Sequence, residues 1–267
     1  MLSVRDWSTL AAPDFAGLDP ERTIAVLPIA AIEQHGAHLP TGTDAIINHG
    51  LWKAARGEIG EDVDVLVLPQ QSIGKSDEHI ASKGTLHVPA EVLIPYLTAI
   101  GLSVARAGIR KLLILNSHGG NSEVMGIVAR SLRVQAAMLV VATSWARMGT
   151  PDGLFAEDEL RFGIHGGAVE TALMLHLAPD EVRMDLAAPT EPRSVALARE
   201  NAVLEGVGRN GFAWIAQDLH PSGIAGDPTA ATAEAGQALA DHAARRVATL
   251  LSEMARFSLA SLHDLEG

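Results

Sequence analysis

Strand-like and helix-like segments alternate along the first half of this chain of 267 residues. Short apolar runs predict the strands, and longer amphipathic or apolar stretches predict the helices between them. The strands are expected at residues 23–28, 62–68, 111–116 and 138–143, and the helices at 44–59, 89–107 and 122–136. Parallel strands need crossover helices of this kind, and the fully apolar middle of 111–116 is typical of a strand covered on both faces. The pattern predicts an α/β fold, a three-layer α/β/α sandwich with a mostly parallel sheet.

The second half of the chain follows a looser pattern. Its expected elements are a short helix at 156–161, an apolar helix that ends at Pro179, an edge strand at 212–219 and a long alanine-rich helix at 229–257. Residues 180–210 give no clear prediction, and residues 1–22 are expected to form an irregular lead-in held by Trp7 and Phe15. No linker or repeat interrupts the chain, so we expect one domain over residues 1–267.

Charge and composition narrow the class of protein. The formal net charge is −12, and 20 scattered Lys and Arg residues offer no basic face of the kind that binds nucleic acid. No stretch approaches the roughly 18 uncharged apolar residues of a membrane span, and the N-terminus has no secretion signal. We therefore expect a cytoplasmic protein with a small-molecule partner and no nucleic-acid or membrane partner. Because the chain contains no cysteine, any bound metal must be held by His, Asp and Glu.

The loop after the first predicted strand contains an imidazole and two carboxylates within twelve residues: Glu33, His35 and Asp44. These side chains follow the carboxyl end of a strand, where open α/β sheets place their ligands. Glycines in the loop allow the backbone to fold back on itself. The combination favours a divalent metal site, and the alternative is a polar surface loop with a helix-capping aspartate.

A second polar cluster follows the strand predicted at 111–116. His118 lies at its carboxyl end, so the same edge of the sheet can bring it close to His35. Gly119 and Gly120 would let the backbone approach an ion or a substrate, and Asn121 can cap the next helix or orient a ligand. A lone histidine here would more often be structural, but the pairing with the first loop favours a metal site.

The third cluster is the glycine-rich turn that contains His165 and leads to Glu170. Glu170 falls on an otherwise apolar helix face, where a carboxylate is costly to bury unless it is paired or bound to a metal. The alternative is a first-turn acid that the helix dipole stabilises. His165 is a candidate general acid or base, with a buried structural histidine as its alternative.

Together, these motifs resemble those of the creatininase (creatinine amidohydrolase) family. The main matches are Glu33-Gln-His35-Gly-x-His38-Leu-Pro-x-x-x-Asp44, His118-Gly-Gly-Asn121 and His165-Gly-Gly-x-x-Glu170-Thr171, with smaller ones at Glu78-His79 and Gly223-Ile-Ala-Gly226. The resemblance covers about residues 23–245 and implies a creatininase-like sandwich assembled as a homohexamer. It also implies cleavage of a non-peptide C–N bond with two divalent metal ions, zinc first and manganese or iron as alternatives.

The resemblance further implies roles for individual residues. Glu33, His35, Asp44 and His118 match metal ligands of the family, with Asp44 as the bridge between the two ions. His165 matches the histidine proposed as its acid or base. By this resemblance, the four ligands and His165 form one active site.

At two positions this chain departs from the members that hydrolyse creatinine. Gly120 stands where they have a metal-binding glutamate, and Ile164 replaces a second glutamate. The His-Gly-Gly-Asn form resembles the branch that holds the deformylase of archaeal flavin biosynthesis and the peptidase of mycofactocin maturation. In that branch we expect Glu170 to supply the missing ligand, so Glu170 counts among both the metal-binding and the catalytic residues. Empty space beside His118 and an apolar wall at Ile164 predict poor hydrolysis of creatinine.

The expected reaction is an amide hydrolysis. Two cations lower the pKa of a bridging water and polarise the substrate carbonyl, and His165 protonates the leaving nitrogen. Alternatives are a metallopeptidase that trims a short peptide and a non-catalytic metal-binding scaffold. The residues expected to line the substrate pocket are Glu78, His79, Gly119, Gly120 and Trp145, with Phe155 as a further aromatic wall.

Overall fold

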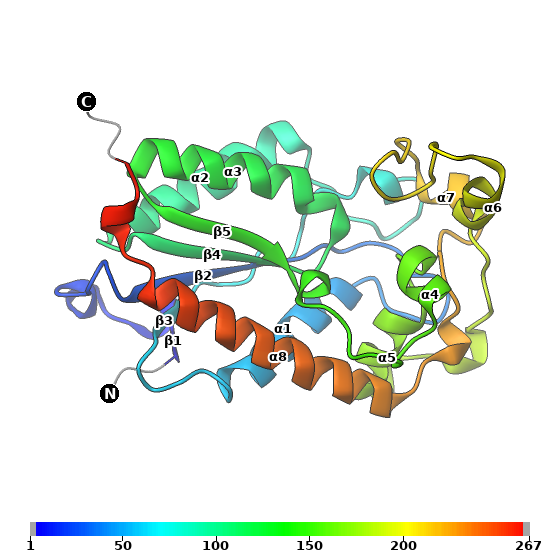
Figure 1. Cartoon of the computed structure of the whole chain (residues 1–267), viewed down its shortest axis with the longest axis horizontal. Coiled ribbons are helices and arrows are strands. Elements are labelled where there is room, and N and C mark those ends of the chain that lie inside the picture. Colours follow the sequence, from blue (N-terminus) through cyan, green and yellow to red (C-terminus); the bar gives the residue numbers. More distant parts are fainter. Residues whose placement is uncertain (1–3, 264–267) are drawn as a thin grey trace.

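The computed structural model describes residues 4–263 and contains a five-stranded sheet with helices on both faces (Figure 1). The strands are β1 (Val4–Asp6), β2 (Thr23–Ile29), β3 (Asp64–Val67), β4 (Lys111–Asn116) and β5 (Leu139–Ser144). They lie in the order β1-β3-β2-β4-β5, and every neighbouring pair is parallel. The predicted α/β fold is confirmed. Residues 1–3 and 264–267 of the predicted domain lie outside the described residues.

The helices form a layer on each face of the sheet. α2 and α3 cover one face, and α1 and α8 cover the other, with α5 packed against α1 and α8 (Figure 1). The smaller helices α4, α6 and α7 lie beyond the carboxyl ends of the strands. The helix bounds are α1 (Thr43–Arg56), α2 (Ala90–Arg106), α3 (Ser122–Ala136), α4 (Glu157–Phe162), α5 (Ala168–Leu177), α6 (Arg193–Glu200), α7 (Ala216–Leu219) and α8 (Ala233–Arg256).

Alternate residues of the strands enter separate hydrophobic cores. In β2, Ile24 and Val26 pack with α1 and α8, whereas Ala25 and Leu27 pack with α2 and α3. Successive side chains of a strand point to opposite faces, so a sheet covered on both sides needs an unbroken apolar run. This requirement explains why β4 is buried along its whole length.

The carboxyl ends of β2 and β4 lie side by side. Ile29 pairs with Asn116 at the ends of the two strands, so residues 30–42 and 117–121 leave the sheet from neighbouring positions. We call these segments the ligand loops. Asn121 joins them, because its Nδ2 donates to Ala30 O at 3.0 Å and to Asn116 Oδ1 at 3.1 Å. Asn121 therefore ties the loops together and does not cap α3 through its side chain.

Some local predictions were wrong. The edge strand expected at 212–219 does not form; α7 occupies its second half and begins where Asp218 Oδ2 accepts a hydrogen bond from Ile215 N at 3.0 Å. Residues 212–215 of that segment line a cavity instead of joining the sheet. α1 begins after Gly42 without a side-chain cap, so the capping role considered for Asp44 is also wrong. β1, missed within the lead-in, has only three residues and leaves no periodic pattern.

Candidate metal centre and active site

The first ligand loop and the start of α1 place Glu33, His35 and Asp44 in the interior of the protein. Their exposed fractions are 1%, 0% and 2%. The loop closes on itself, since Glu33 N donates to Thr41 O at 2.9 Å and His35 pairs with Leu39. Asp44 lies in the first turn of α1, with its side chain directed to the same point. Glycine and short turns thus bring together the three side chains predicted from the sequence.

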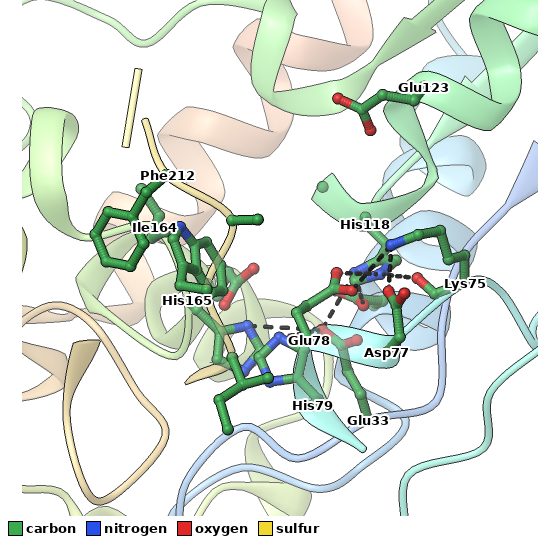
Figure 2. Close-up of a pocket in the computed structure, with 17 residues that line it drawn as sticks. Glu33, Lys75, Asp77, Glu78, His79, His118, Glu123, Ile164, His165 and Phe212 are labelled. Atoms are coloured by element: carbon green, nitrogen blue, oxygen red, sulfur yellow. Dashed lines mark hydrogen bonds and ion pairs between the residues drawn. The ribbon is translucent and has the colours of Figure 1, made fainter. Parts of the chain in front are cut away.

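The second ligand loop adds His118, which is 5% exposed. Its Nδ1 lies 3.1 Å from Glu33 Oε1 and 3.4 Å from Asp44 Oδ2. The backbone N–H of His118 is held by Asn116 Oδ1 at 3.1 Å, which fixes the start of the loop. The two loops predicted to meet at the sheet edge therefore do so, and their four polar side chains converge (Figure 2 shows Glu33 and His118).

Backbone carbonyls orient both imidazoles. His35 Nδ1 donates to Glu33 O at 3.1 Å, which leaves Nε2 facing Asp44. His118 Nε2 donates to Lys75 O at 2.7 Å, which leaves Nδ1 facing Glu33 and Asp44. Metal-binding histidines are commonly held in this way, with one nitrogen bonded to a carbonyl and the other free to coordinate.

Several buried ligand atoms have no hydrogen-bond partner among the described residues: Glu33 Oε2, His35 Nε2 and Asp44 Oδ2. An unpaired polar atom in the interior costs about 1–3 kcal/mol, and more for a charged group. Asp44 also lies between the two histidines, because Oδ1 is 3.4 Å from His35 Nε2 and Oδ2 is 3.4 Å from His118 Nδ1. This donor set suits cations on either side of a shared carboxylate.

The electrostatics of the cluster also favour a cation. Burial alone would lower the pKa of His35, but the neighbouring carboxylates, Asp44 first, raise it to about 9. Burial would raise the pKa of Asp44, yet His35 and His118 hold it below its usual range. The carboxylates thus create a strongly negative interior site, which protons or metal ions can neutralise.

His165 reaches the cluster from the turn before α5. This turn is paired with a distant segment, since His165 N donates to Ala225 O at 3.2 Å and Ala225 N donates to His165 O at 2.8 Å. The imidazole Nε2 donates to Gln34 O at 2.6 Å, and Nδ1 lies 3.6 Å from Glu33 Oε1. Burial, followed by the charges of His35 and His79, holds the pKa of His165 well below its ordinary value. The ring is therefore neutral near pH 7, with Nδ1 toward the cluster.

Glu170 lies in the first turn of α5 and is partly buried. Its Oε2 accepts a hydrogen bond from Gly166 N at 2.6 Å and lies 3.7 Å from His35 Nε2. Burial raises its pKa to about 7. His35, His165 and Glu170 offer ligand atoms that all lie within 4.8 Å of one another. The structure thus brings Glu170 to the site, and its predicted roles as ligand and catalyst stay predictions.

Comparison with known proteins agrees with this geometry. The creatininase (creatinine amidohydrolase) family profile matches residues 8–251. The chain belongs to the creatininase family. It is 30% identical over 233 residues to the mycofactocin precursor peptide peptidase of Mycobacterium tuberculosis, covering 84% of each chain. It is 31% identical over 179 residues to the creatinine amidohydrolase of Pseudomonas putida, covering 61% of this chain and 67% of that one. A solved structure of a candidate creatinine amidohydrolase from Bacteroides fragilis superposes with a TM-score of 0.75 at 26% identity, covering 100% of both chains.

The expectation of empty space beside His118, which followed from Gly120, was wrong. That space is not empty, because a Cβ on residue 120 would overlap the carboxylate of Glu78. Glu78 Oε1 lies 3.3 Å from His118 Nε2, and its Oε2 lies 3.3 Å from Lys75 Nζ. A carboxylate from another segment thus occupies the position that a longer side chain at residue 120 would need, so the absence of that side chain does not enlarge the site.

A cavity of about 580 Å³ opens next to the cluster (Figure 2). Of the predicted substrate-contacting residues, Glu78, His79, Gly119 and Gly120 line it. Trp145 does not: it is 5% exposed and packs in the core with α1 and α8, where Nε1 donates to Asn48 Oδ1 at 3.2 Å. The expectation for Trp145 was wrong because this indole finds apolar cover and a hydrogen-bond acceptor inside the fold.

Phe155 also packs against the cores and does not line the cavity, so the prediction that it forms a wall was wrong. The aromatic lining comes instead from Phe212 and Trp214, which lie in the segment predicted to form an edge strand. The sequence did contain a signal for this lining, because residues 212–215 form an apolar run with no neighbouring strand predicted to pair with it.

Gln34 is a site residue that no sequence pattern predicted, although it lies between two predicted ligands. Its Oε1 accepts from Gly36 N at 2.9 Å, and its Nε2 donates to Gly223 O at 2.6 Å and to His79 Nδ1 at 3.0 Å. His79 is thereby left with Nε2 facing Glu33 Oε1 at 3.4 Å. The ring of His79 stacks on that of His165, with centroids 4.1 Å apart. Gln34 therefore orders several groups around the cluster.

Glu159 was also missed, and no sequence pattern identified it. Its Oε1 accepts from Ala168 N at 2.6 Å, and its Oε2 accepts from Asp227 N at 2.9 Å. A Cβ on Gly163, Gly167 or Gly226 would collide with this carboxylate. The three glycines make room for Glu159, which joins the start of α5 to residues 225–227 and so supports the turn that carries His165.

Proposed function

We propose that this creatininase-family protein is a metal-dependent amidohydrolase that uses two divalent ions to cleave a C–N bond of a small non-peptide amide. The observation that carries the proposal is the set of buried ligand atoms of Glu33, His35 and Asp44 that have no hydrogen-bond partner among the described residues, and Glu33 and Asp44 line the cavity. A purely structural polar cluster would pair these atoms internally. Cyclic amides and formamides are the substrates that we expect.

Asp44 divides the ligands into two groups. Glu33 and His118 would hold one ion with it, and His35 and Glu170 would hold the other. Bound divalent ions supply a water that ionises near neutral pH and a Lewis acid for the substrate carbonyl. Zinc is our first choice, with manganese or iron as alternatives; solved creatininases with fold similarity to this chain are described as Zn-Zn and Mn forms.

The role that we assign to His165 follows from its hydrogen bonds. Because Nε2 donates to Gln34 O and the imidazole is neutral, Nδ1 carries a lone pair on the side of the cluster. His165 can take up a proton there and deliver it to the leaving nitrogen as the C–N bond breaks. The ring of His79 stacks on it and the tilted ring of His35 packs beside it, so both neighbours hold it in place.

Hydrolysis of a short peptide is the second candidate. It is favoured by the similarity to the mycofactocin precursor peptide peptidases, which extends over 84% of this chain. The deformylase of Methanococcus maripaludis, by comparison, matches over 49% of the chain. Both reactions break a C–N bond next to a carbonyl and would use the same residues.

The test is a metal analysis of the purified protein followed by an activity screen. Protein loaded with zinc or manganese is assayed on formamides, cyclic amides and short peptides, before and after chelation. We expect up to two ions per chain and hydrolysis that chelation abolishes and added metal restores. Failure to bind any ion would refute the proposal. Bound metal without hydrolysis of any of the three substrate classes would favour a non-catalytic metal-binding scaffold.

Assembly and location are also proposed. No helix among residues 4–263 is long and apolar enough to cross a membrane. We propose a cytoplasmic protein and, from the family resemblance, a homohexamer that binds no nucleic acid. Light scattering in solution tests the assembly.

A further inference from the structure

One wall of the cavity is apolar and belongs to the least regular part of the chain. It consists of Ile164, Phe212, Trp214 and Ile215, which we call the apolar wall. Ile164 is 38% exposed and Ile215 is 42% exposed, while Phe212 and Trp214 are half-buried. Figure 2 shows Phe212 and Ile164 beside His165, across the cavity from His118 and Lys75.

Folding alone does not account for this wall. None of its four residues belongs to the hydrophobic core clusters formed within residues 4–263. Exposed apolar side chains are common one at a time, but several gathered in a concave site mark a surface for a ligand. The wall is therefore best explained by what enters the cavity.

The wall is connected to the reacting groups. Trp214 and Ile164 border a small space of about 10 Å³ that His79 and His165 also line. Ile164 precedes His165 directly in the chain. A substrate whose leaving nitrogen receives a proton from His165 would thus present the substituent on that nitrogen to the apolar wall.

The opposite side of the cavity is charged. Lys75 is paired there with Asp77 and Glu78, and Glu123 lies at the rim (Figure 2). An apolar group on that side would strip water from charged side chains without replacing their hydrogen bonds. The two walls therefore favour different ends of a substrate.

We infer that the substrate is an amide with an aromatic or branched aliphatic group on the nitrogen side of the scissile bond, and that this group packs against the apolar wall. The inference rests on the proposed amide hydrolysis. Water adds to the carbonyl carbon, the C–N bond breaks, and the products are a carboxylic acid and an amine that carries the apolar group. Burying a phenyl group should improve binding by about 10- to 100-fold over a methyl group.

Binding is tested first with ketones, which have a CH₂ group in place of the amide N–H and cannot be hydrolysed. The metal-loaded full-length protein is titrated with 4-phenylbutan-2-one, which matches N-benzylacetamide, with its isomer 1-phenylbutan-2-one and with butan-2-one. NMR or calorimetry gives the dissociation constants. We expect the 4-phenyl isomer to bind about tenfold or more tightly than either of the others. Equal binding of the three ketones, or a preference for the 1-phenyl isomer, would overturn the inference.

Variants then locate the preference. Phe212→Ala and Trp214→Ala should reduce the advantage of the 4-phenyl isomer to about two- or threefold. Val203→Ala is the matched control, because Val203 is an exposed apolar residue of the same irregular region that does not line the cavity. Circular dichroism and thermal melts confirm that each variant is folded. An unchanged preference in both wall variants would overturn the placement of the group on this wall.

Hydrolysis of the corresponding amides separates this inference from the proposed function. N-benzylacetamide should be cleaved with a kcat/KM about tenfold or more above those of N-methylacetamide and N-methyl-2-phenylacetamide. Cleavage of all three at similar rates would support the amidohydrolase and overturn the apolar preference. Tight binding of 4-phenylbutan-2-one to a protein that cleaves no amide would support the apolar wall as a binding site and reject the proposed reaction.

Discussion

The two sides of the cavity are built in different ways. The ligand loops follow central strands, and their reactive side chains are at most 5% exposed and held by backbone carbonyls. The apolar wall comes mainly from residues 212–215, which belong to no strand or helix and include side chains exposed by 42%. The ligand side is thus held in place by the sheet, while the wall lies on an irregular segment, where we infer that the substrate preference is set.

The two sides of the cavity differ because the ligand loops are held by contacts between distant segments and the apolar wall is held mainly by local ones. The ligand loops inherit the register of β2 and β4, where Ile29 and Asn116 are paired, and Asn121 ties them together again. The segment before α7 is held largely by local bonds, such as those from Glu205 N to Asn210 O and from Asp218 N to Ile215 O. Substitutions on the two sides should therefore differ in size and in kind.

The largest effect is expected from Asp44→Asn. Removing the charge shared by the two proposed ions should release or misplace both, and activity should fall by more than about 10⁴-fold, beyond the loss of a single proton-transfer group. Elemental analysis of the purified variant measures the metal content. Metal content equal to that of the parent protein would contradict the bridging role and weaken the contrast between the two sides of the cavity.

His165→Ala should have the next largest effect, of a different kind. Loss of a proton donor typically lowers kcat by about 10²- to 10⁴-fold while leaving the metals in place. Kinetics and elemental analysis on the same sample give both readings. A variant that loses metal as completely as Asp44→Asn would show that His165 is a ligand and not an acid or base.

Creatinine should be a poor substrate, because Ile164 presents an apolar surface where the family resemblance implies a carboxylate in the members that hydrolyse creatinine. Since Glu78 fills the space beside Gly120, only the change at Ile164 remains, and we expect a cost near the lower end of 2–5 kcal/mol, or roughly 30-fold. A steady-state assay with the zinc-loaded protein should give a kcat/KM below about 10⁴ M⁻¹s⁻¹. A higher value would mean that the apolar wall does not select the substrate.

The smallest effect, about tenfold on kcat/KM, is expected from Glu159→Gln, which removes a charge-assisted hydrogen bond that supports the His165 turn. The free energy of unfolding should fall by about 1–3 kcal/mol. Glu157→Gln is the control, because Glu157 lies in the same first turn of α4 and is exposed. If the thermal melts and kinetics of Glu159→Gln match those of the control, Glu159 does not support the turn that carries His165.

Several features of the site could be predicted from the sequence because they are local. The apolar middle of β4 identified a buried parallel strand, and the position of His118 directly after it placed an imidazole at the carboxyl edge. Glu33, His35 and Asp44 could be grouped because a single loop joins them. For residues 212–219 the same reasoning failed, since a short apolar run does not distinguish a sheet edge from the wall of a cavity.

The sequence by itself determined the alternation of strands and helices along the chain, and with it an α/β fold that has imidazoles and carboxylates at the carboxyl ends of its strands. Only the tertiary structure decided that the carboxylate of Glu78 fills the space beside Gly120, that Trp145 turns into the core and that Trp214 faces the site. Periodicity reports which residues share a face of one element. Which side chains occupy the same space depends on packing between segments distant in the chain, and a local pattern carries no record of it.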